Sequence, residues 1–253
     1  MDGIAGASPR RLARIAGALY LVNIVGGAFA IGFVPATLIV AGDPAATAHA
    51  IQSHEPLYRL GLLAHLVVTL TNVPLAVVFL DLFRVVNRRV TLLVVFFTLV
   101  GTAVETAGLV GQYTPVVLLG AGGPYAGAVP AAQLQALAYL PAALSAIGYS
   151  VAELFFGCYA VCMAFLVFRS TFLPRTIGVL LAAGGLSYLV YSAADLLAPG
   201  FAAHLVPWVQ LPALLGEGSL CVWFLVAGVN VERWRERASA STRPASARME
   251  AVA

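Results

Sequence analysis

One stretch of the chain, residues 148–175, places the strongest constraint on the fold. It is an apolar run that contains a single glutamate, Glu153, and it ends with Arg169, Pro174 and Arg175. A helix of about 20 predominantly apolar residues crosses a bilayer, so this run is long enough to span one. A carboxyl group inside such a span needs a protein partner or a wet cavity. The stretch therefore predicts a membrane helix and makes Glu153 the first candidate for function.

Composition extends this prediction to the whole chain. Apolar residues make up 61% of the 253 positions and charged residues only 10%, against roughly 25% charged residues in an ordinary soluble domain. Most of the surface is therefore expected to face lipid. The chain contains arginine but no lysine and is rich in alanine, leucine and valine, which is typical of a GC-rich bacterial genome. The net charge of +3 is scattered, with no basic stripe between aromatic residues, so nucleic-acid binding is not expected.

The three cysteines, Cys158, Cys162 and Cys221, all lie inside apolar runs. They are not expected to form the disulfide framework of an oxidised domain. Cys158 and Cys162 are four residues apart and share one helix face, so they could offer two thiolates to a soft metal. A buried cysteine more often packs as a small hydrophobic residue. The sequence identifies no cofactor.

Apolar runs predict an all-α, polytopic membrane bundle of six transmembrane helices with short interfacial helices between them. The first run contains a possible signal-peptide cleavage site at residues 28–30, but it continues past that point, so we expect a retained helix. The chain is expected to have three parts. They are a basic cytoplasmic N-terminus at 1–14, a six-helix transmembrane domain at 15–231 and a disordered cytoplasmic tail at 232–253. The six predicted spans cover residues 15–34, 57–86, 90–118, 142–168, 176–197 and 204–230.

Two short interfacial helices are predicted between the spans. Asp43 can cap the N-terminus of the first, with Pro44 in its first position, and this helix is expected to run to about Ser53. The second is expected over residues 130–139, ended by Pro141.

Arginine placement predicts the orientation of the bundle. Most arginines fall in four clusters, and six spans place all four clusters on the same side of the membrane. Because cytoplasmic loops carry an excess of arginine and lysine, both termini are expected in the cytoplasm. The predicted location is the cytoplasmic (inner) membrane of a bacterium. The four clusters lie at residues 10–14, 84–89, 169–175 and 233–237.

Polar residues inside the spans form the candidate binding site. At a rise of about 1.5 Å per residue, Glu105, Glu153 and Glu217 all lie roughly 20–23 Å from the cytoplasmic ends of their spans. They therefore share one level in the outer half of the bundle, and His65 reaches nearly the same height. We expect a polar cluster that is reachable from outside the cell. Its candidate members are His65, Asn72, Glu105, Gln112, Tyr149, Glu153, Asp195 and Glu217.

Three interpretations of this cluster remain open. The carboxyl groups could be protonated or paired and serve only helix packing. They could instead bind or move a small solute or ion through an outward-opening pocket, as intramembrane carboxylates commonly do. A third possibility is a metal-dependent intramembrane enzyme, although no HExxH or similar histidine pair is present. A structural or regulatory membrane subunit is a further alternative. No catalytic residue is identified, and the metal-ligand candidates are His65, His204, Glu153 and Glu217.

Four segments resemble an uncharacterised bacterial family of multi-pass membrane proteins, domain-of-unknown-function family 4386. The most specific of them, FFGCYAVCMAFLVFRSTFLPRTIGVLLAAGGLSYL at residues 155–189, includes an arginine-bearing loop. The resemblance covers most of the chain up to about residue 197. It implies a membrane bundle in a lipid bilayer and brings no assigned activity. The other three segments are ARIAGALYLVNIVGG at 13–27, GDPAATAHAI with RLG at 42–61, and DLFRVVNRR at 81–89.

Overall fold

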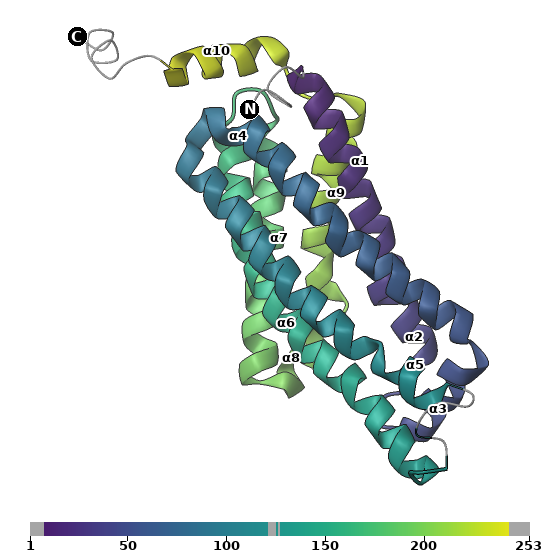
Figure 1. Ribbon diagram of the computed structural model, residues 1–253. Coiled ribbons are helices and arrows are strands. Elements are labelled where there is room, and N and C mark those ends of the chain that lie inside the picture. The colour runs from purple at the N-terminus through teal and green to yellow at the C-terminus, as the bar shows by residue number, and fades with distance from the viewer. Residues whose placement is uncertain (1–7, 121–124, 126, 243–253) are drawn as a thin grey trace.

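Every regular element in the computed structural model is a helix (Figure 1). The structure describes residues 8–120, 125 and 127–242. The predicted all-α class is therefore confirmed for this part of the chain. The elements are α1 (Pro9–Gly27), the π-helix η1 (Ala28–Phe33), α2 (Val34–Leu38), α3 (Pro44–Ser53), α4 (Glu55–Gln112), α5 (Thr114–Leu119), α6 (Ala131–Arg169), α7 (Arg175–Leu197), α8 (Pro199–Leu205), the 3₁₀-helix η2 (Trp208–Gln210), α9 (Leu211–Val226) and α10 (Val231–Thr242).

Five segments of the described chain are long and apolar enough to cross a membrane. They are therefore the helices of a multi-pass membrane protein, in a lipid environment. The number is one fewer than predicted because the second and third predicted spans belong to one segment. The five segments are Pro9–Leu38, Glu55–Leu119, Ala131–Arg169, Arg175–Leu197 and Trp208–Val226.

The long helix α4 turns back on itself at Asn87. Asn87 has φ −158° and ψ 105°, which are not helical values, and its side-chain oxygen accepts from the backbone N–H of Arg89 and of Val90, at 3.1 and 3.2 Å. The amide therefore caps the second half of the helix. Figure 1 shows α4 rising to this turn and returning beside itself, and the Tyr58 hydroxyl donates to the Gln112 carbonyl across the two halves.

The helices pack closely where glycines face a neighbour. A Cβ added to Gly184 of α7 would lie 2.7 Å from the Ala213 Cα of α9, and one added to Gly216 of α9 would lie 2.7 Å from the Leu180 carbonyl oxygen of α7. Gly17 of α1 meets Leu225 of α9 in the same way. Small residues let membrane helices approach at backbone distance, which supplies the dispersion contacts that replace hydrophobic burial in lipid.

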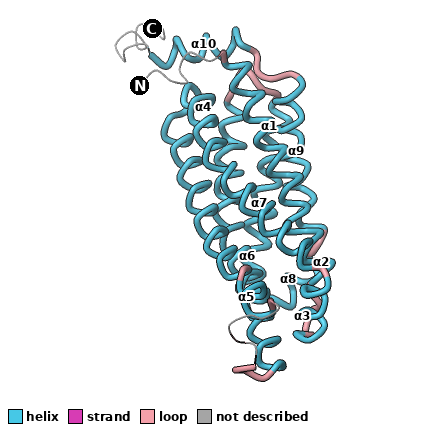
Figure 2. The backbone as a smooth tube through the Cα atoms, turned by 45° about the vertical axis from the view of Figure 1, so that its right-hand side comes forward, coloured by secondary structure: helices cyan, strands magenta, loops and turns pink. Residues whose placement is uncertain are grey.

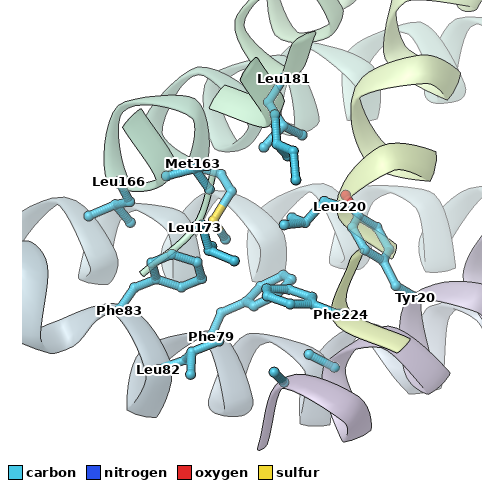
Figure 3. Close-up of a cluster of buried hydrophobic side chains, with 14 of the residues drawn as sticks. Tyr20, Phe79, Leu82, Phe83, Met163, Leu166, Leu173, Leu181, Leu220 and Phe224 are labelled. Carbon is cyan, nitrogen blue, oxygen red and sulfur yellow. The ribbon is translucent and has the colours of Figure 1, made fainter. Parts of the chain in front are cut away.

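Aromatic rings fill the core near one end of the bundle (Figure 3). Phe79 lies at its centre, with ring centroids 6.1 Å from Tyr20, 6.2 Å from Phe83, 6.3 Å from Tyr159 and 6.4 Å from Phe224. Leu82, Leu166 and Leu220 are among the aliphatic side chains that complete the cluster. Through this core, α1, α4, α6 and α9 pack against one another.

The same end of the bundle carries most of the arginines and is called the basic end below. It comprises residues 10–14, 84–89, 169–175 and 230–237. Helix α10 lies across it (Figures 1 and 2). The Trp234 indole N–H donates to the Leu82 carbonyl at 2.8 Å, and Arg237 donates to the Arg169 carbonyl at 2.7 Å. Apart from Arg59, every arginine that the structure describes lies at this end.

These contacts correct the predicted tail. Disorder was expected from residue 232, whereas Val231–Thr242 form α10. The charged composition hid the helix, because α10 is held by side-chain donors to backbone carbonyls that are distant in sequence, those of Leu82 in α4 and Arg169 at the end of α6. Residues 243–253 lie outside the described residues.

Short helices close the far end of the bundle, opposite the basic end. The predicted start of the first is confirmed, because the Asp43 carboxylate accepts from the Ala46 N–H at 2.9 Å and Pro44 opens α3. A second apolar cluster ties α3 and α5 to the ends of α2 and α4. Its members are Val34, Leu38, Ile51, Tyr58, Leu62 and Val116.

Two predicted boundaries at this end differ from those of the structure. Helix α6 does not stop before Pro141 but runs through it from Ala131. A proline removes one backbone hydrogen bond without ending this helix, and α3 and α5 pack against α6. The last span, expected to begin near His204 and Pro207, begins at Trp208 directly after Pro207, because Val206 is extended before Pro207 and separates α8 from η2 and α9.

Candidate functional site

A cavity of about 600 Å³ lies between α1, η1, α4, α6, α7 and the η2–α9 segment. Small-molecule sites commonly enclose about 300–1,000 Å³, so its size suits a small organic ligand. The aromatic core closes it toward the basic end, where Phe79 and Tyr20 form part of its floor. Three carboxyl groups from three different helices face this one space, those of Glu105, Glu153 and Glu217.

Glu153 of α6 is the most deeply buried of the three, with 1% of its surface exposed. Its Oε1 accepts from the Gln210 side-chain N–H of η2 at 2.8 Å. Its Oε2 is buried and has no hydrogen-bond partner among the described residues. Buried polar atoms are nearly always paired, so this oxygen in the wall of a cavity needs a partner that the described residues do not supply, such as water or a ligand.

Glu105 is held by a histidine on the opposite half of α4. The Glu105 Oε1 and His65 Nε2 atoms are 2.9 Å apart, and both residues are buried. One helical turn away, the Asn72 side-chain N–H donates to the Thr102 hydroxyl at 3.1 Å. Asn72 and Glu105 line the cavity, and His65 stands behind Glu105. The hairpin at Asn87 therefore brings these polar groups to one level.

Glu217 lies on α9 beside the Tyr20 hydroxyl. Tyr20 is in turn hydrogen bonded to Tyr159 of α6, with their hydroxyl oxygens 3.0 Å apart. The tyrosine pair joins α1 to α6 across the bundle, and Glu217 adds α9 to this group. The cavity floor is therefore polar at a point where the surrounding core is aromatic.

Five of the eight candidate residues line the cavity. They are Asn72, Glu105, Tyr149, Glu153 and Glu217.

The remaining candidates lie outside the cavity lining. His65 touches the site through Glu105. Asp195 of α7 accepts a hydrogen bond from the Ser150 hydroxyl of α6. Gln112 ends α4, where its backbone carbonyl receives the Tyr58 hydroxyl. His204 is exposed on α8 with its Nδ1 bonded to the Gly200 carbonyl. Among the described residues, no group of three or more His, Cys, Asp or Glu side chains could hold a metal ion.

Sequence reasoning missed most of the aromatic wall. Tyr149, Glu153 and Phe156 follow at intervals of four and three, which places them on one face of α6. That spacing was the available signal for Phe156. Phe79 and Tyr159 had no such signal, because an aromatic residue in a membrane helix can equally face lipid. The aromatic residues of the lining are Tyr20, Phe79, Tyr149, Phe156, Tyr159 and Tyr188.

Comparison with known proteins agrees with the resemblance drawn from the sequence. Neither the curated proteins nor the solved structures gave a match. A family model described as "Domain of unknown function (DUF4386)" matches residues 15–228, which is most of the chain. The protein belongs to this DUF4386 family.

Proposed function

We propose that the protein binds a small organic cation in the cavity and moves it across the membrane. The observation that carries the proposal is the partnerless Oε2 of Glu153, which is buried in the wall of a space that also receives Glu105 and Glu217. None of the residues that line this space is an arginine or a lysine. Burying a carboxylate without a partner is costly, so a bound cation would supply the missing interaction.

The aromatic lining favours an organic cation over a metal ion. Hard divalent ions take several oxygen ligands in a close shell. This cavity instead presents scattered carboxyl groups between tyrosine and phenylalanine rings, such as those of Tyr149, Phe156 and Tyr188. The faces of such rings attract ammonium groups, and the attraction strengthens when water is excluded.

We further propose that the chain crosses the membrane six times, with α4 crossing twice. Each half of α4 exceeds the roughly 20 residues that one crossing needs. The concentration of arginines at the basic end supports a cytoplasmic location for that end and for both termini. In this orientation, within the cytoplasmic membrane, the cavity lies in the outer half of the bilayer.

The aromatic core supports a role in transport. It separates the cavity from the basic end, where the Phe79 ring contacts both the Phe83 and the Phe224 ring. A ligand in the cavity would therefore meet a closed cytoplasmic side. This arrangement corresponds to a state of an alternating-access cycle that is closed toward the cytoplasm, in which the core would have to part for release inside.

The test is uptake of radiolabelled tetraethylammonium into proteoliposomes, with benzenesulfonate as an anion of similar size. Uptake of the cation above that of protein-free liposomes, with no uptake of the anion, is the expected result. Equal uptake of both ions, or of neither, would contradict the proposal. Saturable binding of the cation to the purified protein without uptake would restrict the function to binding.

A further inference from the structure

The cavity reaches the protein surface between η1 and the segment that leads into α9. Exposed residues of the lining fall in these two places and nowhere else in the lining. They are Ala28 and Gly32 on one side, and Val206, Pro207, Leu211 and Leu214 on the other.

Helices α1 and α9 approach each other closely nearer the basic end. There, a Cβ on Gly17 would lie 3.0 Å from the Leu225 backbone nitrogen. Beyond that contact, η1 packs on α1, α2 and α4. A Cβ on Gly27 or Gly32 would meet no atom within 4 Å. The space between η1 and α9 is therefore a side opening, called the mouth below.

The surface around the mouth is apolar. Val25 and Phe33 are 61% and 55% exposed on one side, and Leu214 and Leu215 are 53% and 61% exposed on the other. Leu214 lies about 18 Å along α9 from its end at Val226, at about 1.5 Å per residue, well inside a hydrocarbon core of about 30 Å. An apolar rim inside the hydrocarbon core faces the acyl chains of the lipids.

Trp208 lies at the end of the mouth that is farther from the basic end. It is 70% exposed at the start of the η2–α9 segment. Exposed tryptophans in membrane proteins gather at the boundary between lipid and water. The mouth therefore extends from this boundary into one leaflet, which is the outer leaflet in the proposed orientation.

We infer that the ligand is an amphiphilic cation that enters the cavity sideways from the outer leaflet through the mouth. Its charged group would reach Glu153 and the aromatic rings, while its apolar part would pass the rim formed by Leu211 and Leu214. A π-helix such as η1 is frequent at functional sites in membrane and soluble proteins, which agrees with its position at the mouth. This inference rests on the proposed cation-binding function and adds the ligand class and the entry route.

The first experiment compares two probes on the purified full chain in dodecyl maltoside micelles, which carry no charge. Tetraphenylphosphonium is a cation that dissolves in apolar phases, and tetraethylammonium is a water-soluble one. Equilibrium dialysis with protein-free micelles as the blank gives each affinity. Tetraphenylborate, an anion of the same shape, controls for unspecific partitioning. The expected result is binding of tetraphenylphosphonium at least about tenfold tighter than tetraethylammonium, with no binding of tetraphenylborate.

The second experiment narrows the mouth. Gly32→Leu places a side chain in open space at the rim, and Gly108→Leu is the matched control, because its added Cβ also meets nothing within 4 Å and Gly108 does not line the cavity. Gly32→Leu is expected to slow association of tetraphenylphosphonium by about tenfold or more, whereas Gly108→Leu leaves the rate unchanged.

The outcomes separate this inference from the proposed function. Lateral entry of an amphiphile would be overturned if tetraethylammonium bound as tightly as tetraphenylphosphonium. It would also be overturned if Gly32→Leu left the association rate of tetraphenylphosphonium unchanged. Either result would leave the proposed cation binding intact. Failure of both cations to bind would overturn the proposed function itself. Equal binding of tetraphenylborate would overturn both, because the site would then not recognise charge.

Discussion

His65 and Glu105 hold the two halves of α4 together inside the bundle. Their side chains meet at 2.9 Å, forty residues apart in sequence, and both are at most 6% exposed. No other contact between a basic and an acidic side chain of the described residues joins groups buried to this degree. The pair therefore fixes the height at which Glu105 enters the cavity.

His65→Ala is expected to lower the free energy of unfolding by about 1–2 kcal/mol, because it leaves the Glu105 carboxyl buried without its partner. A double-mutant cycle with Glu105→Gln should give a coupling of about 1 kcal/mol. Unfolding in mixed micelles measures both. His54→Ala is the control, since His54 is exposed and its ring bonds only locally, to the Ala50 carbonyl. Equal effects of His65→Ala and His54→Ala would show that the pair does not stabilise the hairpin.

Close packing of α7 on α9 gives a second prediction. Gly216→Ala is expected to cost about 1–3 kcal/mol, because the new Cβ would stand 2.7 Å from the Leu180 carbonyl oxygen, which belongs to the backbone and cannot rotate away. Gly218→Ala, two residues further on, meets nothing within 4 Å and should leave the melting temperature unchanged. A Gly216→Ala protein as heat-stable as the Gly218→Ala protein would contradict the described α7–α9 interface.

The proposed topology predicts which segments are accessible from outside the cell. A short epitope tag after Arg88 should be protected in intact cells, as should one after Thr242, whereas a tag after Gly42 should be accessible to antibody. The reason is that α4 returns to the basic end at Asn87, so this turn must lie on the same side as α10. Accessibility of the tag after Arg88 together with protection of the tag after Thr242 would mean that α4 does not cross twice.

The sequence predicted the parts of this molecule in which a polar or turn residue has only one favourable place. Asp43 and Pro44 could start a helix in one way, and α3 begins there. Glu105, Glu153 and Glu217 could not face lipid without large cost, so their convergence in one space followed from helix length alone. The same reasoning correctly gave α7 to within one residue of its observed start at Arg175.

Apolar positions were not predictable in this way. In a soluble protein an apolar stripe marks the buried face of a helix, but lipid and protein interior are equally apolar, so Phe79 and Tyr159 gave no sign that they line a cavity. Asp195 and Gln112 are polar and were therefore candidates, yet neither lines the cavity. Asp195 accepts a hydrogen bond from Ser150, and Gln112 lies at the end of α4, where its backbone carbonyl accepts from Tyr58. Helix α10 depends on the carbonyls of Leu82 and Arg169, which are distant in sequence, and no local pattern in its own sequence reveals them.

Glu153→Gln separates a structural role of this residue from a ligand-binding one. The substitution keeps the shape and removes the charge from a residue that is 1% exposed and half-satisfied. Because a buried charge is costly, the free energy of unfolding should be unchanged or rise by about 1 kcal/mol. A loss of more than about 1 kcal/mol, measured in the same mixed micelles, would assign Glu153 to helix packing.

The most direct test of the account is equilibrium binding of tetraethylammonium to the wild-type protein and to Glu153→Gln. Asp81→Asn is the control, because Asp81 lies near the basic end beside Arg84 and does not line the cavity. If the cation binds at Glu153, the wild type binds one cation per chain and Glu153→Gln binds it at least about tenfold more weakly. The affinity of Asp81→Asn is expected to equal that of the wild type. Equal affinities in all three proteins, or failure of the wild type to bind either tetraethylammonium or tetraphenylphosphonium, would contradict the proposed cation site.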